Sequence, residues 1–217
     1  MTHKIVLPAT HTREPFAYDK GEAVLQIVQD YWDALRDNRQ IPLRSDLAPT
    51  ALDYALPHCF IAERVAPEAF RMRVAGQALR DILNMDARGM PISTFLSSDA
   101  RAAITPMIEK LFLRPRVLEF ALQSGRTLAR PTTHARLVML PLRDDQGRTS
   151  RVFGALVTDR AIRLGKRRFG LADEPVIQDR VLRGPSGDVR LIATADQPVA
   201  SETRSSGPGL RLVVDNT

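Results

Sequence analysis

Cysteine is nearly absent from this 217-residue chain, which contains Cys59 and no other. An internal disulfide framework is therefore excluded, and a lone thiol suits a protein of the reducing cytosol. Cys59 falls within a short stretch that predicts a strand. We expect it to behave as a small apolar core residue and not as a reactive thiol.

Long hydrophobic runs are also absent. No stretch approaches the roughly 20 consecutive apolar residues that a membrane helix requires, and residues 1–20 hold no apolar segment like the core of a signal peptide. We therefore expect a soluble, cytoplasmic protein. Since 44% of the residues are hydrophobic, the chain can still bury a substantial core.

Histidine is scarce, and the four that occur are poorly placed to bind a metal. His3 and His11 lie in an N-terminal segment without periodicity, whereas His58 and His134 fall on separate predicted strands. His58 and Cys59 are neighbours on one strand, so their side chains point to opposite faces and do not readily share an ion. We predict no metal site, and we expect His58 to act as a hydrogen-bonding partner beside a proline.

Motifs of catalysis and nucleotide binding are missing. The chain has no G-x-S-x-G, no G-x-x-x-x-G-K-[ST], no H-E-x-x-H, and no G-x-G-x-x-G between a strand and a helix. We therefore predict no catalytic residues and no cofactor. The output of such a non-enzymatic protein depends on contact with another protein or with nucleic acid.

What the chain does contain is a modest excess of positive charge. Its 31 basic and 25 acidic residues give a formal charge of +6. Such charge can attract phosphate, so a nucleic-acid-binding regulator that uses residues 160–168 is one alternative. The simpler interpretation is a solvated basic junction between a domain and its tail. The cluster consists of Arg160, Arg163, Lys166, Arg167 and Arg168.

The first periodic segment, residues 22–38, predicts an amphipathic helix with one apolar stripe. Such a stripe either caps the sheet of its own chain or joins a second subunit. The aromatic surface of Tyr31 and Trp32 suits an interface, so we predict a homodimer held partly by this helix. The expected interface residues are Val24, Ile27, Val28, Tyr31, Trp32 and Leu35.

Five later segments have the composition of strands, and two have that of helices. The polar loop 143–148 contains a glycine and predicts a hairpin. Residues 137–140 and 152–157 are apolar at odd and even positions alike. Because successive side chains of a strand point to opposite faces, both faces of the sheet must be covered. We expect an α+β domain over residues 21–162, with short helices on one face of an antiparallel sheet and the helix 22–38 on the other. The predicted strands are 56–63, 70–75, 116–123, 134–142 and 151–159, and the helices are 77–83 and 98–112.

The ends of the chain are expected to lie outside this domain. Residues 1–20 predict a flexible arm. Residues 163–217 are rich in glycine, proline and charge, and they predict a basic junction followed by a partly ordered appendage. Two islands within it, residues 189–193 and 210–214, have a strand-like composition.

Several motifs, in order along residues 22–162, resemble those of the stand-alone PAS-like proteins common in alphaproteobacteria. The resemblance implies a five-stranded antiparallel sheet, a sensory or regulatory role with or without a small ligand, and frequent dimerisation. It carries over no catalytic residue. The motifs are Tyr31-Trp32 with Leu35-Arg36, Ile41-Pro42-Leu43-Arg44-Ser45-Asp46 with Pro49, Leu56-Pro57-His58, and Phe70-Arg71-Met72-Arg73-Val74-Ala75-Gly76 with Asp86 and Gly89.

In a PAS-like fold, apolar side chains between helices and sheet either line a ligand cavity or form an ordinary core. Arg136 is the polar group of interest, because facing inward it would bind a ligand carboxylate, and otherwise it would pair with Glu119. Flavin photochemistry is not expected, since Cys59 lies outside an asparagine-cysteine-arginine motif. The candidate ligand residues besides Arg136 are Met72, Val74, Phe95, Ile104, Ile108, Phe112 and Phe120.

Overall fold

A computed structural model of the protein describes residues 18–125, 131–162 and 166–183. Its helices are α1 (Tyr18–Arg36), α2 (Gln77–Leu83) and α3 (Ser98–Leu113), with 3₁₀ helices η1 (Arg44–Asp46), η2 (Pro49–Ala51), η3 (Asp53–His58) and η4 (Ile92–Phe95). The strands are β1 (Cys59–Ala66), β2 (Ala69–Ala75), β3 (Arg116–Ser124), β4 (Thr133–Arg143), β5 (Thr149–Thr158) and β6 (Gly170–Val181). Residues 1–17, Arg163 and the islands 189–193 and 210–214 lie outside the described residues.

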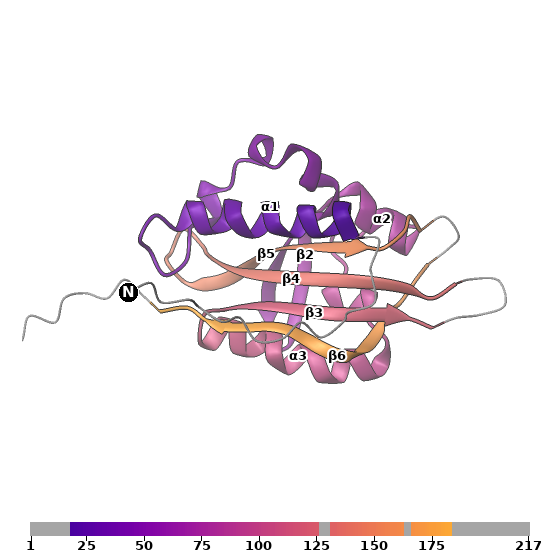
Figure 1. Ribbon diagram of the computed structural model, residues 1–217. Coiled ribbons are helices and arrows are strands. Elements are labelled where there is room, and N and C mark those ends of the chain that lie inside the picture. Colours follow the sequence, from indigo (N-terminus) through magenta and orange to yellow (C-terminus); the bar gives the residue numbers. More distant parts are fainter. Residues whose placement is uncertain (1–17, 126–130, 163–165, 184–217) are drawn as a thin grey trace, which may run out of the picture. The chain divides into compact units, whose positions relative to one another are not determined.

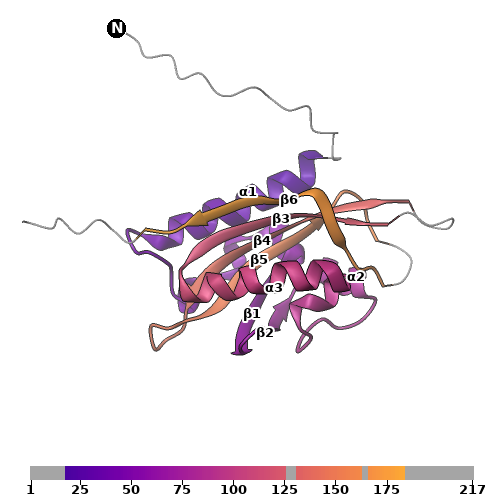
Figure 2. The ribbon, with the colours of Figure 1, turned by 90° about the horizontal axis from the view of Figure 1, so that it is seen from below.

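The strands form one antiparallel sheet (Figure 1), and their order β2-β1-β5-β4-β3-β6 can be followed in Figure 2. β1 lies inside the sheet and pairs with β5, so that Cys59 stands opposite Ala155. The hairpin partner of β1 is β2, which forms one edge. The pairing of β1 with β5 joins early and late segments of the chain in a single antiparallel sheet. Together with the helices this sheet forms the α+β fold that the sequence predicts.

The sheet has six strands, so the prediction of five is wrong. β6 pairs with β3, with Val181 opposite Arg116, although residues beyond 162 were expected to lie outside the domain. β6 is an edge strand, and its ladder is irregular between Leu171 and Val176, the stretch that contains Pro175. Proline and charge are tolerated at an edge, where one side of the strand has no partner strand, and they hide the strand pattern in the sequence.

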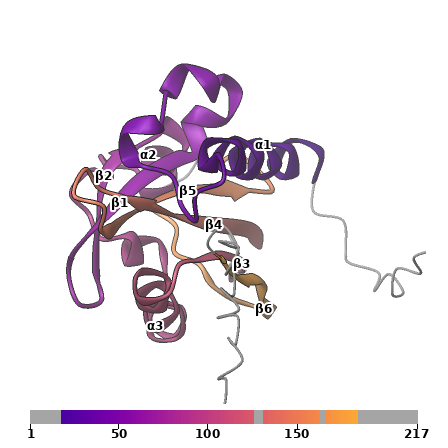
Figure 3. The same ribbon diagram turned by 90° about the vertical axis from the view of Figure 1, so that its left-hand side faces the viewer.

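Helices cover both faces of the sheet, as the two-sided apolar strands predict. α3 lies against one face and α1 against the other, as seen from below in Figure 2 and from the side in Figure 3. The core under α2 and α3 contains Met72, Phe95 and Phe120, and the core under α1 contains Trp32 and Phe153. No helix in the described ranges is long and apolar enough to cross a membrane.

The hairpin between β4 and β5 is organised by one buried carboxylate. Asp144 accepts hydrogen bonds from the backbone N–H groups of Gln146 and Arg148 and from the hydroxyl of Ser150. Burial alone would raise the pKa of Asp144, but these donors and the Arg148 guanidinium lower it to about 2. Gly147 takes a φ of 78°, as the predicted turn requires.

Candidate functional site

An apolar pocket of about 490 Å³ opens on the face of the sheet that α1 covers. Its walls come from the segment between α1 and β1, from β1 and β2, from the start of α2, and from one residue of β5. Most of its lining is aliphatic, proline or phenylalanine. The lining residues are Arg44, Leu47, Pro49, Leu52, Asp53, Leu56, Pro57, Cys59, Phe60, Ile61, Val74, Ala75, Gly76, Gln77 and Phe153.

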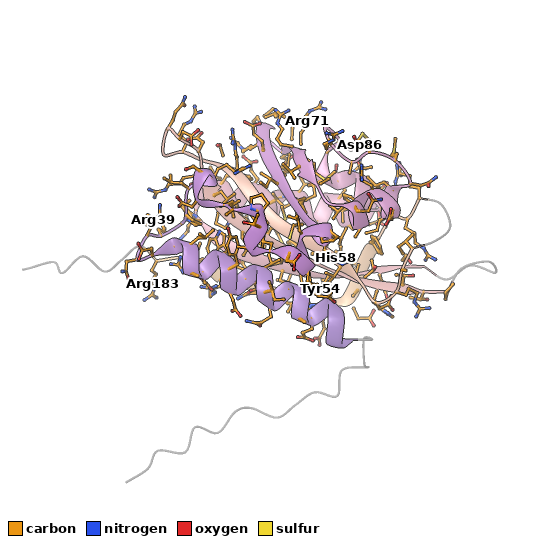
Figure 4. All side chains as sticks on the ribbon, turned by 90° about the horizontal axis from the view of Figure 1, so that it is seen from above. Arg39, Tyr54, His58, Arg71, Asp86 and Arg183 are labelled. Carbon is orange, nitrogen blue, oxygen red and sulfur yellow. The ribbon has the colours of Figure 1, made fainter. Side chains whose placement is uncertain are left out.

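The outer wall of the pocket is the run of 3₁₀ helices that follows α1. Prolines interrupt this run and prevent a continuous α-helix, so the backbone folds in short turns. The Tyr31 hydroxyl ties it to α1, because it donates to the carbonyl of Ala48 and accepts from the N–H of the same residue. η3 lies beside α1 in Figure 4, where Tyr54 and His58 are labelled. The outer wall of the pocket is thus joined to α1 by the chain itself and by these two hydrogen bonds.

Gly76 sets the distance between the outer wall and the end of β2. A Cβ atom at this position would lie 2.2 Å from the carbonyl oxygen of Pro57 and 2.5 Å from that of Leu56. The Gly76 N–H also donates to the Cys59 carbonyl at 2.9 Å. Only glycine allows the two backbones to approach so closely.

Replacing Gly76 with alanine should therefore lower the free energy of unfolding by about 1–3 kcal/mol, because the clash is with backbone atoms that have no rotamer to change. Urea denaturation measures the loss. Gly125→Ala is the matched control, since an added Cβ there meets nothing within 4 Å, and we expect it to stay within about 0.5 kcal/mol of the wild type. Equal stability of Gly76→Ala and the wild type would contradict the close approach.

Cys59 lines the pocket with an unreactive thiol, and its neighbour His58 is not among the lining residues. Burial raises the pKa of the Cys59 thiol to about 12, and its Sγ donates to the Ala55 carbonyl at 3.2 Å. Burial lowers the pKa of His58, against a hydrogen bond with the backbone of Leu156 that raises it. The thiol is therefore protonated at neutral pH, and the imidazole is neutral.

Three polar side chains reach the lining of the pocket. The Gln77 amide is already engaged, because it donates to Asp81 and accepts from Arg80. Asp53 is exposed. Arg44 is half-buried, and no hydrogen bond or ion pair of its guanidinium occurs within the described part of the chain.

The sequence profile of the PAS domain family matches residues 21–157. The chain belongs to this family. The match confirms the PAS-like α+β fold that the motifs predict, and it assigns the chain to a class of sensor domains used in signal transduction. A search of curated protein sequences found no match.

Solved structures similar to this PAS domain include light-oxygen-voltage proteins. One, from work on a flavin analogue, is 17% identical with a TM-score of 0.40, over 50% of this chain and 82% of its own. The light state of the Aureochrome1 domain is 14% identical, with a TM-score of 0.37, over 50% and 85%. An RNA-binding light-oxygen-voltage receptor is 16% identical, with a TM-score of 0.36, over 71% and 36%.

Six of the eight predicted ligand residues lie together in one core of this PAS domain, and Val74 and Arg136 lie on the other face of the sheet. Met72, Phe95, Ile104, Ile108 and Phe120 are packed in the core under α2 and α3, each at most 2% exposed. Phe112 is partly buried against the same core and stacks on Phe70, with ring centroids 5.4 Å apart. These side chains form a packed core.

Val74 lies on the other face and lines the pocket. In the β1–β2 ladder Met72 stands opposite Ala62 and Val74 opposite Ile61, so Arg73 is an extra residue without a partner. This β-bulge reverses the alternation of side chains. The prediction that Met72 and Val74 share one face is therefore wrong.

Arg136 pairs with Glu119, which is the second of the two roles that the sequence left open for it. Its Nε donates to Glu119 Oε1 at 2.7 Å, and Nη1 lies 3.2 Å from Glu22 Oε1 on α1. Burial alone would lower the pKa of Arg136, but the two carboxylates raise it, Glu119 above all. The guanidinium is therefore neutralised on the α1 face by the pairing that the second alternative expects, and it is not free to bind a ligand carboxylate.

The predicted interface on α1 is largely internal. Val24, Val28 and Trp32 are at most 1% exposed and pack on the sheet of their own chain. Tyr31 and Leu35 are half-buried, and Ile27 is 38% exposed. The first three residues are therefore unavailable to a second subunit, because the hydrophobic effect already buries them inside the chain.

Four residues of the basic cluster, Arg160, Lys166, Arg167 and Arg168, lie in described parts of the chain between β5 and β6. Arg160 pairs with the neighbouring Asp159, and Arg167 donates through Nη1 to the Ser124 hydroxyl at 2.7 Å and to the Pro131 carbonyl at 3.1 Å. Lys166 and Arg168 are exposed. At least one cation of the cluster, Arg167, is thus engaged inside the fold, whereas the nucleic-acid alternative would have it contact phosphate.

Proposed function

We propose that this PAS domain is a non-enzymatic regulatory module whose output passes through contacts of α1 with another protein chain. The observation that supports the proposal is the link between pocket and helix. The 3₁₀ segment that walls the pocket follows α1 directly and is tied to it by the two hydrogen bonds of Tyr31 with Ala48. A change in the pocket therefore acts on the position of α1.

The chemistry of the pocket supports a role in binding instead of catalysis. Its thiol has a pKa of about 12, so Cys59 is a poor nucleophile at neutral pH. Its polar side chains are Arg44, Asp53 and Gln77, of which none is placed as a base beside a nucleophile. Binding energy in such a pocket can change only conformation and contacts.

The outward side of α1 is the surface we propose for these contacts. Ile27 is an exposed large apolar residue on the helix, and Leu35 is half-buried two turns later. The simplest partner is a second copy of this chain, in the homodimer that the family resemblance implies. Small rotations of a helix at such an interface are a common way to transmit a signal.

Replacing Ile27 with glutamate should convert the homodimer into a monomer, because an interface does not tolerate a buried unpaired carboxylate. Light scattering or native mass spectrometry of the full chain measures the mass. Val65→Glu is the control, since Val65 is equally apolar and 44% exposed but lies on β1. A wild type that is already monomeric at tens of micromolar would contradict the homodimer.

A partner that is a different protein, and not a second copy of this chain, is tested with the same variants. Wild-type protein immobilised on beads should retain specific proteins from an extract of the source cells, Ile27→Glu should lose them, and Val65→Glu should keep them. Failure of both experiments, with no self-association and no retained protein that depends on Ile27, would overturn the proposed function.

A further inference from the structure

We propose that the pocket on the α1 face binds a small amphipathic monocarboxylate, an apolar chain with one carboxylate head, and that Arg44 receives the head. This inference rests on the regulatory function proposed above and names the class of its ligand. It places the ligand on the α1 side of the sheet, whereas the sequence pointed to the space under α2 and α3.

The body of the ligand must be apolar, because the wall offers almost nothing else. Leu47, Leu52, Ile61 and Phe153 contribute hydrocarbon surface to a volume of about 490 Å³. That volume lies within the range of pockets that hold small organic ligands. A polar body would lose its hydration here without gaining hydrogen bonds.

The mouth of the pocket is open, so a molecule can enter from solvent. Leu56 and Val74 both line the pocket, and they are 39% and 45% exposed. Exposed aliphatic side chains that flank an apolar hollow gain free energy when a ligand covers them. An apolar chain inserted between them would remove this surface from water.

Charge identifies the head group. Arg44 is the half-buried polar group of the lining, and its guanidinium has no ion pair within the described ranges. A guanidinium binds a carboxylate through two parallel charge-assisted hydrogen bonds. Asp53 also borders the pocket and is exposed, so a second negative charge on the ligand would be repelled. A ligand with a single carboxylate can bind Arg44 without placing a second negative charge near Asp53.

The space under α2 and α3 is the weaker candidate for the same ligand. Ile104, Ile108 and Phe120 are at most 1% exposed there, and all three belong to one buried hydrophobic core. Arg136 lies on the other face and is paired with Glu119. A carboxylate under α3 would therefore not meet the Arg136 guanidinium.

The test compares three ten-carbon probes that differ only in the head: decanoate, decan-1-ol and decylammonium. Each is titrated into the full chain in a calorimeter, the two charged probes below their micelle concentrations and decan-1-ol below its solubility limit. We expect saturable binding of decanoate, about tenfold or more tighter than of decanol, which corresponds to one charge-assisted contact. Decylammonium should bind most weakly.

Two variants of Arg44 and one control assign the head group. Arg44→Gln should weaken decanoate about tenfold and leave decanol unchanged, and Arg44→Glu should reverse the preference toward decylammonium. Arg73→Gln removes a cation that pairs with Glu63 and does not line the pocket, so it should bind decanoate as the wild type does. Thermal unfolding of each variant checks that it is folded.

Isoleucine methyl signals locate the bound probe. Decanoate should shift the signal of Ile61, which lines the pocket, and leave those of Ile104 and Ile108 in the other core unchanged. Shifts confined to Ile104 and Ile108 would overturn the site. Absence of saturable binding to any probe would overturn the ligand, and equal binding of decanoate to Arg44→Gln would overturn the carboxylate class.

These outcomes are separate from those of the regulatory proposal. A protein that binds decanoate at Ile61 but neither dimerises nor retains a partner would refute the proposed function and keep the ligand site. A protein that dimerises through Ile27 but binds no probe would refute the ligand site and keep the function.

Discussion

Replacing Trp32 with alanine is expected to lower the free energy of unfolding by about 3–5 kcal/mol, the usual cost of truncating a buried tryptophan. Trp32 is fully buried between α1 and the sheet. Its Nε1–H donates to the Pro141 carbonyl at 3.0 Å, and the Arg36 guanidinium lies over its ring at 5.4 Å. The truncation leaves a cavity and removes a hydrogen-bond donor from the buried Pro141 carbonyl, and both effects destabilise the docked helix.

Denaturation in urea, followed by circular dichroism, measures this loss. Ile27→Ala is the control on the same helix, because Ile27 is 38% exposed, and it should cost less than about 1 kcal/mol. Trp32→Phe separates the hydrogen bond from the packing. Because Trp32 is the only tryptophan of the chain, its fluorescence in the wild type reports the docking of α1 directly. A loss below 1 kcal/mol for Trp32→Ala would mean that α1 is not held as described.

Replacing Glu119 with alanine is expected to cost about 3 kcal/mol, near the lower end of the range for removing one partner of a buried ion pair. The side chains of Glu119 and Arg136 are 4% and 12% exposed. Without Glu119 the Arg136 guanidinium stays buried and charged, and it keeps only Glu22, whose side chain is 57% exposed. That remaining contact is why the lower end of the range applies.

A double replacement tests whether the cost comes from the unpaired charge. Glu119→Leu combined with Arg136→Met should be much closer to the wild type than Glu119→Ala, because neither buried charge is then left alone. The control is Glu63→Gln, which breaks the more exposed pair with Arg73 and should cost less than about 1 kcal/mol. If the double variant were as unstable as the single one, packing and not charge would explain the loss.

The sequence by itself determined the features that depend on local periodicity and composition. The apolar stripe of the segment 22–38 predicts a helix that covers a sheet, and three of its six predicted residues, Val24, Val28 and Trp32, are buried in that way. Apolar residues at both parities of 137–140 and 152–157 require cover on both faces, and α1 and α3 provide it. The amphipathic period and the sheet alternation are encoded over a few neighbouring residues, so they can be predicted without a structure.

The tertiary structure alone decided which residues share a face and where a pocket lies. One extra residue, Arg73, moves Val74 across the sheet from Met72, and no local pattern marks that bulge. β6 is a strand because β3 offers it a partner edge, in spite of its charge and Pro175. The pocket with Arg44 exists because Gly76 lets the chain approach η3, 18 residues before it. These are contacts between segments that only the fold brings together, and pairing register is a property of two strands and not of one.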